Sequence, residues 1–112
     1  MQIVSEKINR AELVRISDHY FGDMTKGVVD VENGLVAIDA ELHADLETLL
    51  LEHGSKQEQL WGINRYPDED GEDFLEFDSL INIRPQQNNR GRGVNDPVIR
   101  EKIREIVSRW FE

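Results

Sequence analysis

Two stretches of sequence decide the fold: Leu60-Trp61-Gly62-Ile63-Asn64-Arg65-Tyr66-Pro67 and Phe74-Leu75-Glu76-Phe77-Asp78-Ser79-Leu80-Ile81-Asn82-Ile83-Arg84-Pro85. Apolar and polar side chains alternate along much of both stretches, which is typical of β-strands that bury one face. The acidic segment 68–73 separates them, and the aspartates and glycine in this segment favour a turn. The sequence therefore predicts a β-hairpin whose strands are Leu60–Pro67 and Phe74–Pro85.

The two faces of this predicted hairpin differ in character, because side chains along a strand alternate between its faces. The apolar face carries Trp61, Ile63, Leu75, Phe77, Ser79, Ile81 and Ile83. The opposite face carries Asn64, Tyr66, Glu76, Asp78, Leu80, Asn82 and Arg84. We call Asn64, Tyr66, Asn82 and Arg84 the polar strip. Tyrosine and arginine are favoured at interfaces, so we predict that the polar strip binds a partner or ligand. The alternative is an ordinary solvent-facing sheet surface.

The remaining elements follow from local signals. Asn33-Gly34 lies between β-branched stretches and predicts a second hairpin over residues 27–38. Helices are predicted after a cap at Asn9, over Glu41–His53, and from Asp96-Pro97 onward. Residues Ile3–Ile8 favour a short edge strand. The resulting order, (β)αββαββα, predicts a single α+β domain over residues 1–112. We expect a two-layer sandwich, an antiparallel sheet of roughly four or five strands with about three helices on one face.

Charge and composition restrict the classes of function. The 112 residues include 23 acidic and 13 basic side chains, a net charge of −10, and no cysteine. Nucleic-acid binding is therefore not expected, because it needs cations that neutralise phosphates. Cysteine–zinc sites and disulfides are excluded. The sequence has no apolar run long enough to span a membrane and no signal-peptide pattern at its start. We therefore expect a soluble cytoplasmic protein that does not contact membranes.

His43, Asp45 and Glu47 stand at the start of the predicted helix Glu41–His53. His43 and Glu47 are four residues apart and therefore share one face of that helix. Imidazole and carboxylate groups in this arrangement could bind a divalent metal such as zinc or manganese. The alternative is that the carboxylates stabilise the positive end of the helix dipole. No other cofactor is expected, since nucleotide-binding and hydrolase motifs are lacking.

Residues 79–95 contain no acid and three arginines: Arg84, Arg90 and Arg92. From residue 86 the segment lacks an apolar period, which predicts an irregular loop. Arginine forks match carboxylate or phosphate groups, and nearby glycines let backbone amides approach an anion. We therefore extend the predicted binding surface from the polar strip to Arg90 and Arg92, for a protein partner or a small anionic ligand. The acidic and basic ends of the hairpin also permit a two-fold homodimer.

Four blocks of the chain carry a resemblance to a known family: Phe21-Gly22-Asp23-Met24, Glu41-Leu42-His43-Ala44-Asp45-Leu46-Glu47, Gly54-Ser55-Lys56-Gln57-Glu58-Gln59-Leu60-Trp61-Gly62-Ile63-Asn64 and Ser79-Leu80-Ile81-Asn82-Ile83-Arg84-Pro85. Together they resemble a small prokaryotic family known only as a domain of unknown function. The resemblance extends over nearly the whole chain. It implies a bacterial or archaeal cytosolic protein that stands alone as one domain. It implies no activity, cofactor or catalytic residue.

Two functions from different classes stay open at the level of sequence. The first is a non-enzymatic binding or interaction module that uses the polar strip together with Arg90 and Arg92. The second is a metal-dependent, hydrolase-like enzyme centred on His43, Asp45 and Glu47. An enzyme needs a pocket in which such side chains converge, whereas a binding module needs only an accessible surface. The sequence alone does not decide whether the protein is an enzyme.

Overall fold

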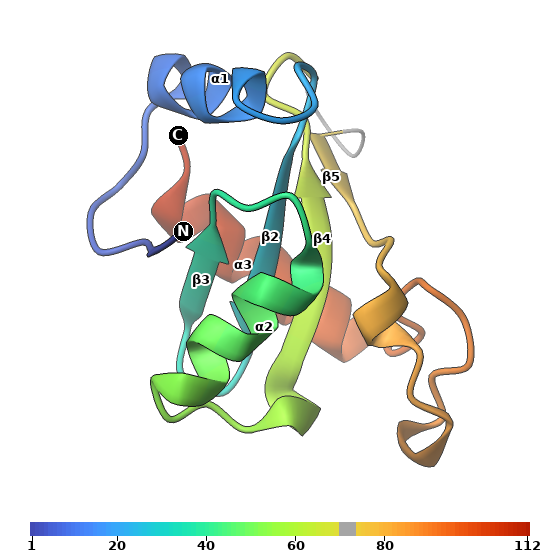
Figure 1. Cartoon of the computed structure of the whole chain (residues 1–112). Coiled ribbons are helices and arrows are strands. Elements are labelled where there is room, and N and C mark those ends of the chain that lie inside the picture. Colours follow the sequence, from blue (N-terminus) through green and yellow to red (C-terminus); the bar gives the residue numbers. More distant parts are fainter. Residues whose placement is uncertain (70–73) are drawn as a thin grey trace.

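A computed structural model describes residues 1–69 and 74–112 of the chain. These ranges form a five-stranded antiparallel sheet, in the order β1-β3-β2-β4-β5, and three α-helices (Figure 1). The strands are β1 (Gln2–Ile3), β2 (Thr25–Asp30), β3 (Leu35–Ile38), β4 (Leu60–Arg65) and β5 (Leu75–Glu76). The helices are α1 (Arg10–Asp18), α2 (His43–Glu52) and α3 (Pro97–Trp110). The predicted α+β class, antiparallel sheet and order of elements are thereby confirmed. No helix in the two described ranges is long and apolar enough to cross a membrane.

The hairpin of β2 and β3 turns around Asn33-Gly34, as the sequence predicts. The buried carboxylate of Asp30 holds this turn by accepting hydrogen bonds from the backbone N–H groups of Glu32 and Asn33, at 2.9 and 3.0 Å. The hydroxyl of Ser55 donates a further hydrogen bond to Asp30 at 2.6 Å. Burial acts to raise the pKa of Asp30, but these hydrogen bonds outweigh it and hold the pKa below its usual value.

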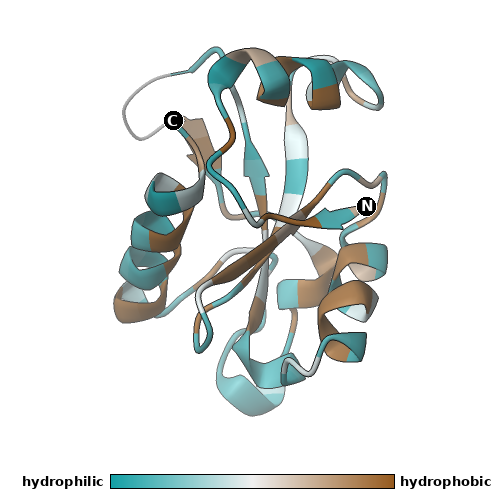
Figure 2. Ribbon diagram, turned by 90° about the vertical axis from the view of Figure 1, so that its left-hand side faces the viewer, coloured by the Kyte–Doolittle hydropathy of each residue, from teal (hydrophilic) through white to brown (hydrophobic). Residues whose placement is uncertain are grey.

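The helices cover both faces of the sheet, which corrects the prediction that they lie on one face. On one face Val29 and Trp61 belong to a core cluster that includes side chains of α1 and α3. On the other face Val28 and Leu60 pack with Leu46 of α2. Figure 2 shows helices on either side of the sheet. The physical reason is that neighbouring residues of the central strands are apolar, so both faces must be removed from water.

The second hairpin forms, but its second strand is much shorter than predicted. Strand β5 pairs with β4 through Asn64 opposite Glu76 and Arg65 opposite Leu75, so the predicted parity of the two strands is confirmed where they pair. The prediction of one strand over Phe74–Pro85 is wrong beyond Glu76. The chain there leaves the sheet and forms short 3-10 turns over residues 80–82 and 85–87. The predicted acidic turn lies partly outside the described residues.

Side chains take the place of the missing strand. The amide of Asn82 accepts a hydrogen bond from the backbone N–H of Gly62 at 2.8 Å and donates to its carbonyl at 3.0 Å. The guanidinium of Arg84 donates to the carbonyl of Leu60 at 2.6 Å and also to the carbonyl of Gln57. The outer edge of β4 is therefore satisfied without a continuous neighbouring strand.

Candidate functional site

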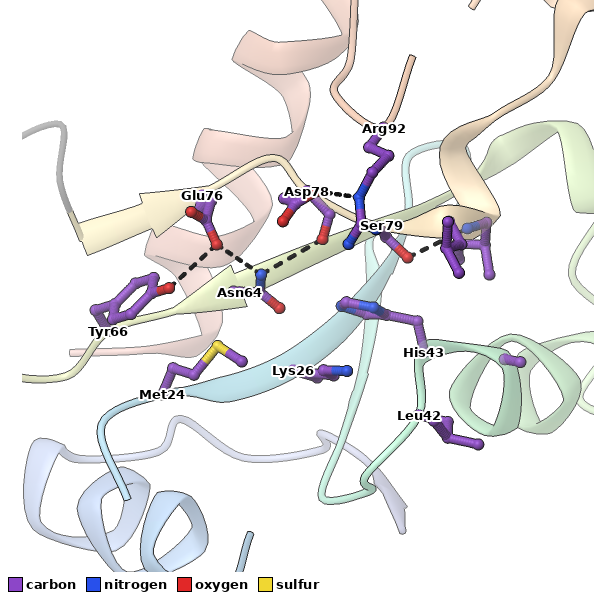
Figure 3. A pocket seen from close by; sticks show the side chains of 13 residues that line it. Met24, Lys26, Leu42, His43, Asn64, Tyr66, Glu76, Asp78, Ser79 and Arg92 are labelled. Atoms are coloured by element: carbon purple, nitrogen blue, oxygen red, sulfur yellow. Dashed lines mark hydrogen bonds and ion pairs between the residues drawn. The ribbon is translucent and has the colours of Figure 1, made fainter. Parts of the chain in front are cut away.

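A cavity of about 480 Å³ opens on the face of the sheet that α2 covers (Figure 3). It lies between the start of α2, the strands β2 and β4, and the segment that contains and follows β5. We call this cavity the His43 pocket. Its polar lining is formed by Lys26, His43, Asn64, Tyr66, Glu76, Asp78, Ser79 and Arg92. Its apolar lining is formed by Met24, Leu42, Ala44, Leu80 and Ile81.

Three side chains form a row across neighbouring strands of the pocket. Lys26 of β2 stands opposite Asn64 of β4, and Asn64 stands opposite Glu76 of β5. Directly opposed residues project from the same face of a sheet, and adjacent strands lie about 4.8 Å apart. The row therefore places a cation, an amide and a carboxylate next to one another. The pairing of β2 with β4 creates it, and these strands are not consecutive in the chain.

Asn64 occupies the centre of this row and is 4% exposed. Its Nδ2 donates hydrogen bonds to Glu76 Oε1 at 2.8 Å and to the carbonyl oxygen of Asp78 at 3.4 Å. The hydroxyl of Tyr66 also donates to Glu76 Oε1, at 3.1 Å. Asn64 Oδ1 is buried and has no hydrogen-bond partner in the described structure. In Figure 3 this oxygen points toward the side of the pocket where His43 lies. The pocket therefore contains an unused acceptor.

His43 is the first residue of α2 and is 7% exposed. Its Nε2 lies 2.8 Å from the carbonyl oxygen of Ile63. Because a carbonyl oxygen only accepts, Nε2 carries the hydrogen, and Nδ1 of the neutral ring is left as an acceptor. Burial lowers the pKa of His43 below its usual value, and the positive charge of Lys26 adds to this effect. The hydrogen bond to the carbonyl of Ile63, the side chain of Asn64 and the charge of Asp78 act in the opposite direction without overcoming the burial. The contact between His43 and Asn64 does not have the geometry of a normal hydrogen bond, so Asn64 Oδ1 is still an unused acceptor. The imidazole is therefore neutral at pH 7.

A glycine makes room for the ring of His43 over the sheet. A Cβ atom on Gly62 would lie 3.2 Å from His43 Cδ2 and 2.5 Å from Ser79 Cβ. These two distances are shorter than normal van der Waals contacts, so only glycine fits between the side chains of His43 and Ser79. Ser79 itself accepts a hydrogen bond from the backbone N–H of Ile81 at 3.3 Å, which starts the turn that follows β5. Gly62 and Ser79 thus shape the floor beside His43.

The outer side of the pocket is closed by an ion pair. Arg92 Nε donates to Asp78 Oδ1 at 2.6 Å, and the two side chains are 53% and 41% exposed. An exposed pair of this kind stabilises the fold by less than about 1 kcal/mol. Its main consequence for the site is that the two charges neutralise each other.

The structure divides the residues that the sequence selected. Asn64, Tyr66 and Arg92 line the His43 pocket. Asn82 and Arg84 are 0% and 5% exposed and direct their polar groups at the protein backbone. Arg84 also stacks on the ring of Trp61, with 4.1 Å between the guanidinium carbon and the ring centroid. Arg90 is exposed and lies outside the pocket lining.

The loop that carries Arg90 is organised by one buried asparagine. Asn89 Nδ2 donates to the carbonyls of Asn82 and Gly93 at 2.7 and 2.8 Å. Its Oδ1 accepts from the backbone N–H of Asn95 at 2.8 Å. Asn89 is 2% exposed and, like Asn82, directs its polar groups at the protein backbone. The arginines of this segment therefore have three different environments: buried, exposed, and paired with Asp78 at the pocket.

The residues predicted to bind metal do not converge. His43 points into the sheet, whereas Asp45 is exposed on α2. Burial raises the pKa of Glu47, and the opposing influence of Arg84 and Gln57 places this carboxylate near them rather than in the pocket. Across residues 1–69 and 74–112, no three or more His, Cys, Asp or Glu side chains form a group that could hold a metal ion.

Sequence reasoning did not point to Lys26, and it placed Glu76 and Asp78 on the correct face without assigning them a role. Lys26 stands directly before the buried residues Gly27, Val28 and Val29, and a lysine at such a position is a signal because this residue type is rarely buried. The sequence does not show which residues lie beside Lys26, because this depends on the pairing of β2 with β4.

Comparison with family models gives a match over residues 2–110 to a protein family of unknown function, DUF5674. Comparison with curated proteins and with solved structures gives no match. A family of unknown function agrees with the resemblance seen in the sequence. Because the match covers almost all of the chain, the protein belongs to the DUF5674 family.

Proposed function

We propose that the protein binds a small polar molecule in the His43 pocket. The observation that carries the proposal is the buried oxygen of Asn64, which has no hydrogen-bond partner in the described structure. An unsatisfied buried acceptor costs about 1–3 kcal/mol, and a hydrogen-bond donor on a bound ligand would remove that cost. The cavity volume of about 480 Å³ lies within the range of small-molecule sites.

Two further properties support binding of a small molecule. The polar groups are held in place before any ligand arrives, since Asn64 and Tyr66 both donate to Glu76 and His43 is held by the carbonyl of Ile63. Binding to such a preorganised site loses little conformational entropy. The rim also exposes apolar surface, because Leu42 and Leu80 are 54% and 66% exposed.

Of the two functions that the sequence leaves open, this proposal retains the binding module but places its binding surface at the His43 pocket. The surface is the inner part of the polar strip together with His43, rather than the whole strip. The metal-dependent alternative has less support, because in the described part of the chain His43, Asp45 and Glu47 do not form a group that could hold a metal ion.

A thermal-unfolding screen with a library of polar metabolites tests the proposal. A ligand at about 100 times its Kd stabilises a protein by roughly 2.7 kcal/mol, which is a shift of several degrees for a domain of this size. The wild type and Asn64→Ala are compared, with Asn95→Ala as the matched control. Asn95 is exposed, and its side chain donates to the carbonyl of Asn88.

We expect a compound that shifts the wild type and Asn95→Ala but not Asn64→Ala. Amide chemical-shift changes on titration of that compound should be concentrated at His43, Asn64 and Glu76. A shift of equal size in Asn64→Ala would place binding elsewhere. A complete lack of binding across the library would refute the proposed function.

A further inference from the structure

Two charges of the His43 pocket, those of Lys26 and Glu76, are separated rather than paired. Lys26 lies at one end of the cross-strand row and Glu76 at the other, two strand spacings or about 10 Å apart at the backbone. In the described ranges, no carboxylate oxygen lies within ion-pair distance of the Lys26 ammonium. That ammonium instead lies 4.9 Å from the centroid of the Phe21 ring. In the described structure the row thus has a positive end without an ion-pair partner at Lys26 and a negative end at Glu76.

The other charges of the pocket cancel. Arg92 and Asp78 form an ion pair with each other, and His43 is neutral. A ligand that carries only a carboxylate could pair with Lys26 but would be repelled by Glu76. A ligand that carries only an ammonium could pair with Glu76 but would be repelled by Lys26. Either ligand would pair with one end of the row and leave the charge at the other end without an opposite charge, so a ligand that carries both charges complements the row better.

We infer that the ligand is a small zwitterion that carries a primary ammonium and a carboxylate, as free amino acids do. This inference rests on the proposed function. An ammonium has three donors and no acceptor, which matches the free Oδ1 of Asn64 and the carboxylate of Glu76. The ligand carboxylate then faces Lys26. The exposed apolar rim at Leu42 and Leu80 is available to the ligand side chain.

The flexibility of Lys26 makes this fit physically consistent. The ammonium and carboxylate of an amino acid are closer together than the backbones of β2 and β5. Lysine carries its charge on a four-carbon stem, which can bring the ammonium toward the centre of the row. Asn64 and Tyr66 meanwhile hold the carboxylate of Glu76 in place.

The test uses three forms of one molecule. Each standard L-amino acid is first screened by thermal unfolding against the intact protein. The amino acid that binds best is then titrated calorimetrically beside its N-acetyl derivative, which lacks the ammonium, and its amide, which lacks the carboxylate. We expect each derivative to bind at least about tenfold more weakly than the parent.

Two variants assign the two ends of the ligand. In Lys26→Met we expect the parent to bind no better than the amide, with the affinity for the amide unchanged. In Glu76→Gln we expect the parent to bind no better than the N-acetyl derivative, with the affinity for the N-acetyl derivative unchanged. Glutamine can still accept the hydrogen bonds of Asn64 and Tyr66. The matched controls Lys102→Met and Glu105→Gln lie exposed on α3 and should bind the parent as the wild type does.

The outcomes separate this inference from the proposed function. Derivatives that bind as tightly as the parent would refute the inference that the ligand is a zwitterion. A Lys26→Met variant that loses as much affinity for the amide as for the parent would also refute it. If no amino acid binds but another polar compound binds in an Asn64-dependent way, the zwitterion is wrong and the proposed function stands. If nothing in either screen binds, both are refuted.

Discussion

Replacing Asn82 by alanine tests whether one side chain substitutes for a β-strand. Asn82 is fully buried and makes hydrogen bonds of 2.8 and 3.0 Å to the N–H and C=O of Gly62. It also donates to the carbonyl of Arg92 at 2.9 Å. Alanine would leave the N–H and C=O of Gly62 without a partner, whereas the carbonyl of Arg92 would keep the hydrogen bond that it accepts from the backbone N–H of Ser79 at 3.0 Å. Each unsatisfied buried group costs about 1–3 kcal/mol, so the two groups of Gly62 alone imply a loss of about 2–6 kcal/mol.

Water entering the vacated space would recover part of this loss, and we therefore expect a destabilisation of about 3 kcal/mol. Such a loss corresponds to a decrease in Tm of roughly 12 °C or more for a domain of about 100 residues. The assay is equilibrium unfolding in urea, followed by circular dichroism and tryptophan fluorescence. Coincident transitions from the two probes would justify a two-state analysis.

The matched control for this experiment is Asn95→Ala, which removes an exposed hydrogen bond in the same part of the chain. We expect that variant to remain within about 0.5 kcal/mol of the wild type. If Asn82→Ala were destabilised by less than about 1 kcal/mol, the reasoning would fail. The role of Asn82 as a partner contact, predicted from the sequence, would then regain support.

The remaining predictions concern three other buried residues. Gly62→Ala should destabilise the fold by about 1–3 kcal/mol, because the new Cβ would lie 2.5 Å from Ser79 Cβ. Arg84→Lys should cost about 1–2 kcal/mol and change tryptophan fluorescence, because lysine cannot reproduce the fork on two backbone carbonyls or the stacking on Trp61. His43→Gln should remove a pH dependence. The unfolded state binds a proton as the pH falls through the usual pKa of about 6.5, whereas the folded wild type, in which the pKa of His43 is lowered, binds it only at lower pH. The stability of the wild type therefore decreases from about pH 7 toward pH 5.

Exposed residues of the same type provide the controls for these three variants: Gly91→Ala, Arg90→Lys and His53→Gln. Each should unfold within about 0.5 kcal/mol of the wild type in urea. Equal effects of a buried variant and its exposed control would contradict the packing argument for that position. For the histidine pair, the prediction fails if the wild type and His43→Gln lose the same free energy of unfolding between pH 7 and pH 5.

Local sequence signals predicted much of the fold because the interactions behind them span only a few residues. Asn9 accepts a hydrogen bond from the backbone N–H of Glu12 at 2.9 Å, as its predicted role as a helix cap requires. Asp96 does the same for Val98 at 2.8 Å. The Asn33-Gly34 turn and the parity of β4 with β5 are likewise correct.

Alternation of side chains along the strands predicted only part of the His43 pocket. Alternation along β4 placed Asn64 and Tyr66 on one face, and both line the pocket. The same alternation grouped Asn82 and Arg84 with them, although both turned out to be buried against the backbone. Periodicity describes a continuous strand, and it carries no information about where a chain leaves the sheet.

By itself, then, the sequence determined most of the elements, their order, the turns and caps, and which side chains share a face where two strands pair. These features depend on backbone geometry and on contacts between near neighbours in the chain. Only the tertiary structure decided that β2 pairs with β4, so that Lys26 stands beside Asn64. Only the packing of α2 on the face opposite α1 and α3 brought His43 over that same pair. Both depend on burying apolar surface contributed by segments far apart in the chain, and no local pattern records which distant segment will cover it.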